Sequence, residues 1–340
     1  MTAANRPPVN NRAQPNGQDM ENAHRAVTAI AAAFATKVVG QEDLRETLLI
    51  GLLTGGHILL EGVPGLAKTT AARVMADAVS ARFNRIQCTP DLLPSDILGT
   101  QIYDSDSNSF VVQLGPVHAN IVLLDEINRS SAKTQSAMLE AMEERQTTIA
   151  GESHPIPQPF LVIATQNPVD QEGTYPLSEA QTDRFMLKDV LRYPTPREEA
   201  EVIFRLDAGL FDRSEPERPV LSLETMKILQ RLTHNVHLDP VLVHYISEVV
   251  HATRKPSQYL PQHLARLIEY GASPRATIAF SRATRAAALL AGRNHVLPDD
   301  IRNLAHRVLR HRLILGFEAV SAGVSTDDIV DAVMQSVRVP

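Results

Sequence analysis

The sequence is poor in the residues that form covalent cross-links and aromatic stacks. It has 340 residues, a single cysteine, no tryptophan and 4% aromatic residues. One cysteine cannot form a disulfide within the chain, which fits a reducing compartment. Cys88 ends the apolar-leaning stretch 83–87, so we expect a buried strand residue rather than a nucleophile. The scarcity of aromatic rings argues against a channel in which nucleic-acid bases stack.

Long apolar runs are also missing. No stretch reaches the roughly 20 apolar residues of a membrane-spanning helix, and the first eight residues contain no apolar signal core. These absences predict a cytoplasmic protein without membrane insertion. The net charge of −6 makes the chain a poor general ligand for nucleic acid, so we expect no nucleic-acid partner.

Composition changes twice along the chain and predicts three regions. Residues 1–20 are rich in Asn, Pro, Gln and Gly, which predicts a disordered tail. Residues 21–195 alternate between apolar runs and helical stretches, as in an α/β domain with a parallel sheet. From 196 to 340 the helix-start signals Asp239-Pro240 and Ser273-Pro274 predict a second domain made of helices only.

Short apolar runs predict the strands of the sheet. They lie at 57–61, 83–88, 120–124 and 160–165. Helices are expected from about Glu21 to Val39 and from Gln41 to Thr54. The alternating stretches 100–112 and 147–159 are typical of β-hairpins inserted between core elements. Such inserts are often functional, and plain surface decoration is the alternative.

A glycine-rich segment between a predicted strand and a predicted helix indicates a phosphate-binding loop. It consists of Gly62, Val63, Pro64, Gly65, Leu66, Ala67, Lys68 and Thr69, and it runs into a helix through Thr70. In such a turn the backbone N–H groups face phosphates, the Lys68 ammonium reaches the β/γ oxygens, and the Thr69 hydroxyl holds Mg²⁺. Ala67 stands where the general pattern has glycine, which we expect to be tolerated only at negative φ. The segment predicts a nucleoside triphosphatase.

Polar residues follow two of the predicted strands. Asp125 and Glu126 end the run that begins at Ile121, and Asn167 follows the strand at 160–165. In a parallel sheet the carboxyl ends of strands face the ligand, so Asp125 is expected to hold Mg²⁺ and Glu126 to activate the attacking water. Asn167 is placed to bond the γ-phosphate or the water, and a turn residue before Pro168 is the alternative. Together with the loop, this predicts ATP hydrolysis.

Two arginines are candidates for stabilising transition-state charge. Arg184, in Asp183-Arg184-Phe185, has no obvious helical partner and could serve a neighbouring subunit's γ-phosphate, or form a surface salt bridge. Arg275 could reach the nucleotide from the helical domain, or remain solvated. The nearby residues His234, His237 and His244 have no Cys or carboxylate at ligand spacing, so they predict no metal site.

The chain resembles the MoxR-type AAA+ ATPases over about residues 25–330. The resemblance rests on several motifs in order: Val39-Gly40-Gln41, Gly62–Thr69, Pro90–Asp96, Leu124–Arg129, Lys133–Ser136, Ala164–Pro168, Gln171–Pro176 and Gly271–Ala276. It implies a P-loop AAA+ core, in which helices flank a parallel sheet with β-hairpin inserts, followed by an all-helical lid domain. An alanine at position 67 is usual in this family.

The resemblance also implies roles for single residues. Lys68 and Thr69 correspond to the end of Walker A, and Asp125 and Glu126 to Walker B. Asn167 is similar to sensor 1, Arg275 to sensor 2 and Arg184 to the arginine finger, while Val39 and Gly40 would lie near the adenine.

Members of this family tend to form hexameric rings with ATP and Mg²⁺ at subunit interfaces and hairpin inserts facing the pore. They act as chaperone-like remodelers of protein clients or activators of partner complexes, often with proteins that contain a von Willebrand factor A (VWA) domain. Two alternatives stay open for this chain: a DNA-directed ATPase, and a chelatase-like motor subunit for metal insertion.

Overall fold

The computed structural model describes residues 16–169, 173–211 and 219–340. Most of the predicted tail, together with Gln171 and Glu172, lies outside these ranges. The first helix, α1 (Gly17–Lys37), begins four residues before the expected start at Glu21, so residues 17–20 are helical rather than disordered. The side chain of Asn16 explains the early start, because it caps the helix by accepting a hydrogen bond from the Asp19 amide.

A five-stranded parallel sheet in the order β2-β5-β8-β1-β9 forms the centre of the α/β part. Its strands are β1 (Ile58–Glu61), β2 (Phe83–Gln87), β5 (Ile121–Asp125), β8 (Leu161–Gln166) and β9 (Leu187–Val190). Four of them confirm the predicted strands to within one residue. The sequence did not reveal β9, because Lys188 and Asp189 interrupt its apolar character. Pairing with β1 makes it a strand, and the buried Asp189 carboxylate accepts a hydrogen bond from Thr47.

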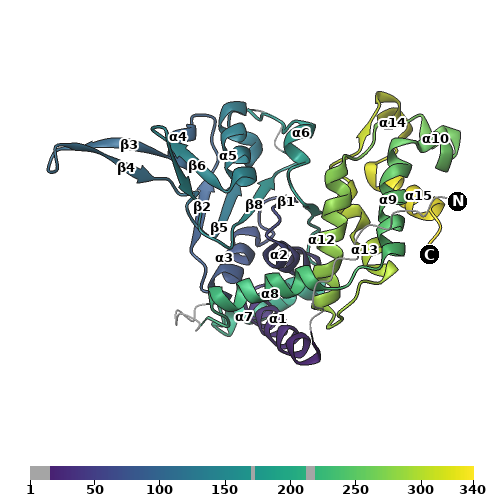
Figure 1. Cartoon of the computed structure of the whole chain (residues 1–340), viewed down its shortest axis with the longest axis horizontal. Helices are drawn as coiled ribbons and strands as arrows, with labels where there is room; N and C mark the ends of the chain where they lie inside the picture. Colours follow the sequence, from purple (N-terminus) through teal and green to yellow (C-terminus); the bar gives the residue numbers. More distant parts are fainter. Residues whose placement is uncertain (1–15, 170–172, 212–218) are drawn as a thin grey trace, which may run out of the picture.

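Helices cover both faces of this sheet (Figure 1). Ile58 and Leu60 of β1 belong to one apolar cluster with α1, α2 (Glu42–Thr54) and α3 (Lys68–Ala78). Leu59 points the other way and joins a second cluster with α5 (Ala132–Glu144). This alternation explains why the central strands read as continuous apolar runs. Shorter elements near the second face are α4 (Pro94–Leu98), the 3-10 helix η1 (Ile127–Arg129) and α6 (Glu179–Thr182).

Both predicted hairpins are present. The first, β3 (Gly99–Asp104) with β4 (Ser109–Leu114), projects from the body of the molecule (Figure 1). The second, β6 (Gln146–Ile149) with β7 (Glu152–Pro155), follows α5 directly. The first hairpin exposes apolar side chains rather than burying them, among them Tyr103 and Phe110, whose rings meet edge to face at 5.4 Å.

The C-terminal part is mostly helical. Its helices are α7 (Pro196–Asp207), α8 (Leu223–Asn235), α9 (Pro240–Arg254), α10 (Pro256–Tyr259), α11 (Gln262–Ala265), α12 (Pro274–Leu290), α13 (Pro298–Leu309), α14 (Phe317–Ala322) and α15 (Thr326–Ser336). Asp239 and Ser273 cap α9 and α12 as their Pro-containing start signals predicted. The prediction of helices alone is wrong in one detail, because β10 (Ile268–Tyr270) pairs with β11 (Ile314–Leu315). Strands this short carry no periodicity in the sequence.

The helical part is fastened to the sheet by buried charges. The Arg312 guanidinium, with its side chain only 2% exposed, pairs with Asp183 at 2.8 Å and donates to the carbonyls of Phe185 and Met186. The largely buried Arg307 of α13 pairs with Asp43 and Glu46 of α2, whose carboxylates remain exposed. One apolar cluster also runs from α1 and α2 into α8, α9 and α12. The predicted division near residue 196 therefore does not separate two apolar cores. Within the described residues, no helix combines the length and apolar character needed to cross a membrane.

His57 is a buried titratable group at the start of β1. Its Nδ1 accepts a hydrogen bond from the Val162 amide at 3.0 Å, so its proton sits on Nε2, which lies 3.1 Å from the Met142 carbonyl. Burial lowers the pKa of this imidazole from 6.5 to about 4. The ring is therefore neutral at pH 7 and links β1, β8 and the end of α5.

Acidification is expected to destabilise the protein through His57. The unfolded chain protonates this group near pH 6.5 and the folded chain near pH 4, so the free energy of unfolding falls as pH decreases through that window. From pH 7.5 to pH 5 the loss due to His57 is about 2 kcal/mol. Urea unfolding at both pH values should show that acidification lowers the free energy of unfolding of His57→Gln by about 2 kcal/mol less than that of the unchanged protein. Equal losses in the two proteins would contradict the buried neutral ring.

Candidate functional site

The glycine-rich loop lies between the carboxyl end of β1 and the start of α3. Its first residue is tied to the neighbouring strand, because the Gly62 amide donates to the Gln166 carbonyl at 3.1 Å. Lys68 opens α3, and its Nζ donates back to the Gly62 carbonyl at 2.6 Å. Burial lowers the pKa of this ammonium, while the carboxylates of Asp125 and Glu126 act in the opposite direction. The Lys68 ammonium is thus bonded to the loop, and the carboxylates of Asp125 and Glu126 favour its charged form.

Ala67 corrects one expectation. It precedes α3 with φ +55°, in the left-handed region, whereas an alanine at this position was expected to require a negative φ. Gly65 has φ +89°, so two residues of the loop, Gly65 and Ala67, have positive φ. The left-handed conformation costs an L-residue about 1–2 kcal/mol. Strain of this kind persists where the surrounding structure fixes the backbone, and it is typical of functional loops.

The two carboxylates predicted as a pair lie at the same edge of the sheet as the loop. Asp125 ends β5, and its Oδ1 accepts a hydrogen bond from the Thr165 hydroxyl at 2.8 Å. The same hydroxyl accepts from the Glu126 amide at 2.9 Å, so Thr165 of β8 sets the position of both acids. The other oxygen of Asp125 pairs with Arg85 at 2.6 Å. The Asp125 carboxylate therefore already forms an ion pair with a cationic side chain.

Glu126 has an unusual backbone. Its φ is +57°, in the left-handed region, immediately after the strand. Its Oε2 accepts a hydrogen bond from Gln87 at 3.1 Å and lies 3.4 Å from Arg129. The left-handed backbone and the contacts with Gln87 and Arg129 hold the Glu126 carboxylate in place. Backbone strain of this kind is typical of functional sites.

Asn167 lies one residue beyond β8 and is 7% exposed. Its Oδ1 accepts a hydrogen bond from the Val169 amide at 3.1 Å, which is the turn role anticipated as the alternative. It shares the carboxyl edge of the sheet with Asp125 and the loop. The turn bond holds the Asn167 side chain in place at this edge.

The segment Val39-Gly40 lies near the same edge. A Cβ on Gly40, whose φ is +64°, would collide with the Glu198 side chain of α7. The next residue, Gln41, donates to the Arg192 carbonyl at 3.1 Å, and Leu191 lies against Gly62. The residues predicted to line the adenine side are thus connected to the start of the loop.

The two candidate arginines are at the opposite edge of the sheet. Arg184 precedes β9, and two residues later the Met186 amide donates to the carbonyl of His57, which comes just before β1. Arg184 Nε pairs with Glu143 Oε2 at 2.9 Å, and Arg275 at the start of α12 pairs with the other oxygen of the same carboxylate. The structure therefore brings the arginines together, but not with the loop of their own chain.

Sequence reasoning missed three residues of this arrangement. Thr165 gave a faint signal as a polar residue inside an apolar strand, and Arg85 alternates within β2. Glu143 gave none, because an acid near the end of an amphipathic helix is ordinary. Cys88 is buried as expected but lies one residue beyond β2, and burial raises the pKa of its thiol to about 12, which opposes a nucleophilic role.

Comparisons with known proteins agree with this geometry. Residues 57–187 match the family model "ATPase family associated with various cellular activities (AAA)", and residues 262–333 match an AAA lid domain. The chain is 43% identical to Chaperone MoxR1 of Mycobacterium tuberculosis, over 96% of this chain and 89% of that protein. It is 30% identical to Protein MoxR of Methylorubrum extorquens, over 90% and 93%. A crystal structure of a candidate ATPase from Cytophaga hutchinsonii superposes with a TM-score of 0.89 at 43% identity, covering 95% of this chain and 97% of that one.

Replacing Ala67 by glycine should relieve the left-handed backbone. We expect Ala67→Gly to raise the free energy of unfolding by about 0.5 kcal/mol, because the relief of strain exceeds the added freedom of the unfolded chain. The control is Ala137→Gly inside α5, which should lower it by about 1 kcal/mol. Denaturant unfolding measures both, and an equal loss at the two positions would contradict the positive φ of Ala67.

Proposed function

The chain belongs to the MoxR family of AAA+ ATPases and hydrolyses ATP, and from this premise we propose that it is a ring-forming remodeler of protein clients whose active sites are shared between neighbouring subunits. The observation that carries the proposal is the separation of the loop and the two arginines. They occupy opposite edges of one sheet, so a complete site needs the loop edge of one copy and the arginine edge of the next.

At the loop edge, the residues suit a nucleotide with a divalent cation. The backbone N–H groups from Gly62 to Thr69 and the Lys68 ammonium would hold the phosphates. Thr69 and Asp125 supply the hard oxygen donors that Mg²⁺ prefers, and Arg85 already occupies the cation position at Asp125. Mg²⁺, when bound, would neutralise phosphate charge. Val39 and Gly40 would lie beside the adenine.

Glu126 would act as the general base toward the attacking water. Its carboxylate is held by Gln87 and Arg129, and its backbone is fixed through Thr165. Asn167, anchored by its turn bond, would orient the water or the γ-phosphate. The chain thus supplies a base, an orienting amide and the phosphate cradle from one edge of the sheet.

Arg184 and Arg275 would complete the site of the neighbouring subunit. In the single chain they are not free cations, because Glu143 accepts from both. A neighbour's γ-phosphate carries more charge than a carboxylate, so it can compete for both guanidinium groups when subunits meet. Hydrolysis removes that competitor, which returns the arginines to Glu143 and weakens the contact between subunits. We propose a hexamer, the ring size typical of the family.

Mixing two inactive variants tests the shared site. Lys68→Ala should not bind ATP, and Arg184→Ala should bind it but hydrolyse it poorly. In mixed rings, the loop of Arg184→Ala meets Arg184 of a Lys68→Ala neighbour, and about one interface in four is complete when the variants mix at random. We therefore expect mixing to restore measurable steady-state ATP hydrolysis.

The control is the mixture of Lys68→Ala with Glu126→Gln/Arg184→Ala, in which every loop-competent subunit lacks its base. It should stay inactive, and sedimentation velocity with Mg-ATP should show that both mixtures assemble equally. If assembled mixtures of the two single variants remain inactive, Arg184 serves its own chain and the shared-site proposal is wrong.

The projecting hairpin β3–β4 supports a protein client. Phe110 is 65% exposed and Tyr103 is 54% exposed, on a hairpin that buries little of its own surface. Exposed apolar groups of this kind are typical of interaction sites. We propose that the hairpin contacts clients in the pore of a cytoplasmic ring, and that a VWA-domain protein delivers or regulates those clients.

Substitution in the hairpin should separate client handling from ATP hydrolysis. We expect Phe110→Ser to lose the ability to suppress aggregation of thermally denatured citrate synthase in the presence of ATP, while its basal hydrolysis stays within about twofold. Light scattering measures the first and phosphate release the second. Phe317→Ser is the matched control, because Phe317 is 85% exposed on α14, away from the hairpin. Equal effects of the two substitutions would contradict a role for the hairpin.

A further inference from the structure

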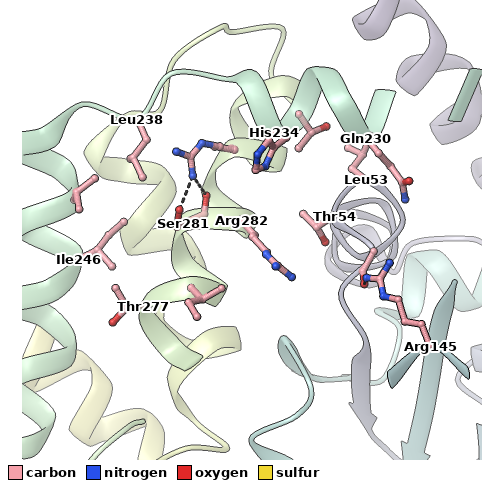
Figure 2. A pocket seen from close by; sticks show the side chains of 15 residues that line it. Leu53, Thr54, Arg145, Gln230, His234, Leu238, Ile246, Thr277, Ser281 and Arg282 are labelled. Carbon is pink, nitrogen blue, oxygen red and sulfur yellow. Dashed lines mark hydrogen bonds between the residues drawn. The ribbon is translucent and has the colours of Figure 1, made fainter. Parts of the chain in front are cut away.

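A cavity of about 510 Å³ lies at the junction between the α/β part and the helical part (Figure 2). The end of α2, α8, α9 and α12 contribute its walls, and Arg145 enters from the residue after α5. Gly55 in its lining precedes β1, so the cavity is at the amino end of that strand, whereas the phosphate loop follows its carboxyl end. Its volume is in the range of small-molecule sites, which often occur between domains.

The charge of this cavity is one-sided. Among the residues that the structure describes, its lining contains Arg145, Arg282 and Arg285 but no aspartate or glutamate. Figure 2 shows the Arg282 side chain extending from α12 toward Arg145 and the end of α2. Burial lowers the pKa of Arg145, and the nearby charge of Arg282 lowers it further. The two guanidinium groups therefore repel each other across the opening, and an anion between them would relieve that repulsion.

Neutral groups accept the hydrogen bonds of Arg145. Arg145 donates to the Gly55 carbonyl at 3.2 Å and to the Gln158 side-chain oxygen at 3.0 Å. Arg285 donates to the Val236 carbonyl and to Ser281. Within the described ranges, neither Arg145 nor Arg282 has a carboxylate at ion-pair distance, unlike Arg184, Arg275, Arg307, Arg310 and Arg312. The chain as a whole has a net charge of −6, so the excess of positive charge at Arg145 and Arg282 is local to this cavity.

The remaining lining combines apolar side chains with hydroxyl groups, the Gln230 amide and the His234 imidazole. Leu53, Leu238, Val243, Ile246 and Ile278 form the apolar surface, and Thr54, Thr277 and Ser281 supply hydroxyls. A convergent set of cations beside an apolar wall suits a ligand with an anionic head and an apolar or ring-shaped body. An inorganic anion would contact only the arginines of such a site and not its apolar wall.

We propose that this cavity binds a small phosphate-bearing organic molecule, with the phosphate between Arg145 and Arg282 and the body against α9. Guanidinium groups form paired hydrogen bonds with phosphate oxygens, and a dianion between the two arginines would offset their repulsion. Such a ligand would contact both parts of the chain, so its binding would stabilise the junction between them. This binding does not depend on the proposed ring or on the shared active site.

The test uses the full-length Lys68→Ala protein, so that the lysine of the phosphate loop cannot bind the phosphate probes. The probe is phenyl phosphate, which carries a dianion on an apolar ring, and inorganic phosphate is the comparison. Isothermal titration should show saturable binding of phenyl phosphate, about tenfold tighter than that of inorganic phosphate because the ring is buried. The thermal unfolding midpoint should rise with phenyl phosphate concentration.

Arg282→Gln in the same background should weaken phenyl phosphate binding about tenfold or more, because a charge-assisted hydrogen bond is lost. Arg302→Gln on α13 makes the same chemical change outside the cavity and should leave binding unchanged. Absence of saturable binding, or binding that Arg282→Gln does not weaken, would overturn the proposal. Either result would leave the shared-site proposal intact, since no nucleotide or ring takes part in this measurement.

Discussion

The parallel register of β5, β8 and β1 is the constraint on which the rest of the arrangement depends. Because all three strands run the same way, their carboxyl ends meet at one edge and bring Asp125, Thr165 and Glu61 into neighbouring positions. A hydroxyl from one strand then fixes two acids that follow another. Had β1 or β5 run in the opposite direction, the loop and the acids would lie at opposite ends of the sheet.

The same constraint produces a second, amino edge, where charge is organised differently. There Glu143 joins the two candidate arginines, and Arg312 fastens the helical part to Asp183. Buried ion pairs are costly unless well hydrogen-bonded, and Arg312 meets that condition through four backbone carbonyls. At the edge that we propose to face a neighbouring subunit, the Arg312–Asp183 pair is thus buried, while Arg184 and Arg275 keep partly exposed side chains.

Local patterns predicted much of this molecule. The strands at 57–61 and 160–165, the helix from Gln41 and the caps Asp239 and Ser273 depend on residues adjacent in the chain, so the sequence contained the required information. The early start of α1 at Gly17 was missed because a single asparagine cap outweighs a polar composition. Strand β9 was missed because it exists only through pairing with β1.

By itself, the sequence determined the α/β class, the loop from Gly62 to Thr69 and the acids after β5, because each is a short pattern with its own physical requirement. Only the tertiary structure decided the left-handed backbone of Ala67, the bridging role of Thr165, the shared partner Glu143 and the arginine-lined cavity. The last three of these features join residues far apart in the sequence, such as Thr165 with Asp125, 40 positions apart, and Arg275 with Glu143, 132 positions apart. Which distant side chains meet depends on how the strands pair and the helices pack, and no local spacing encodes it.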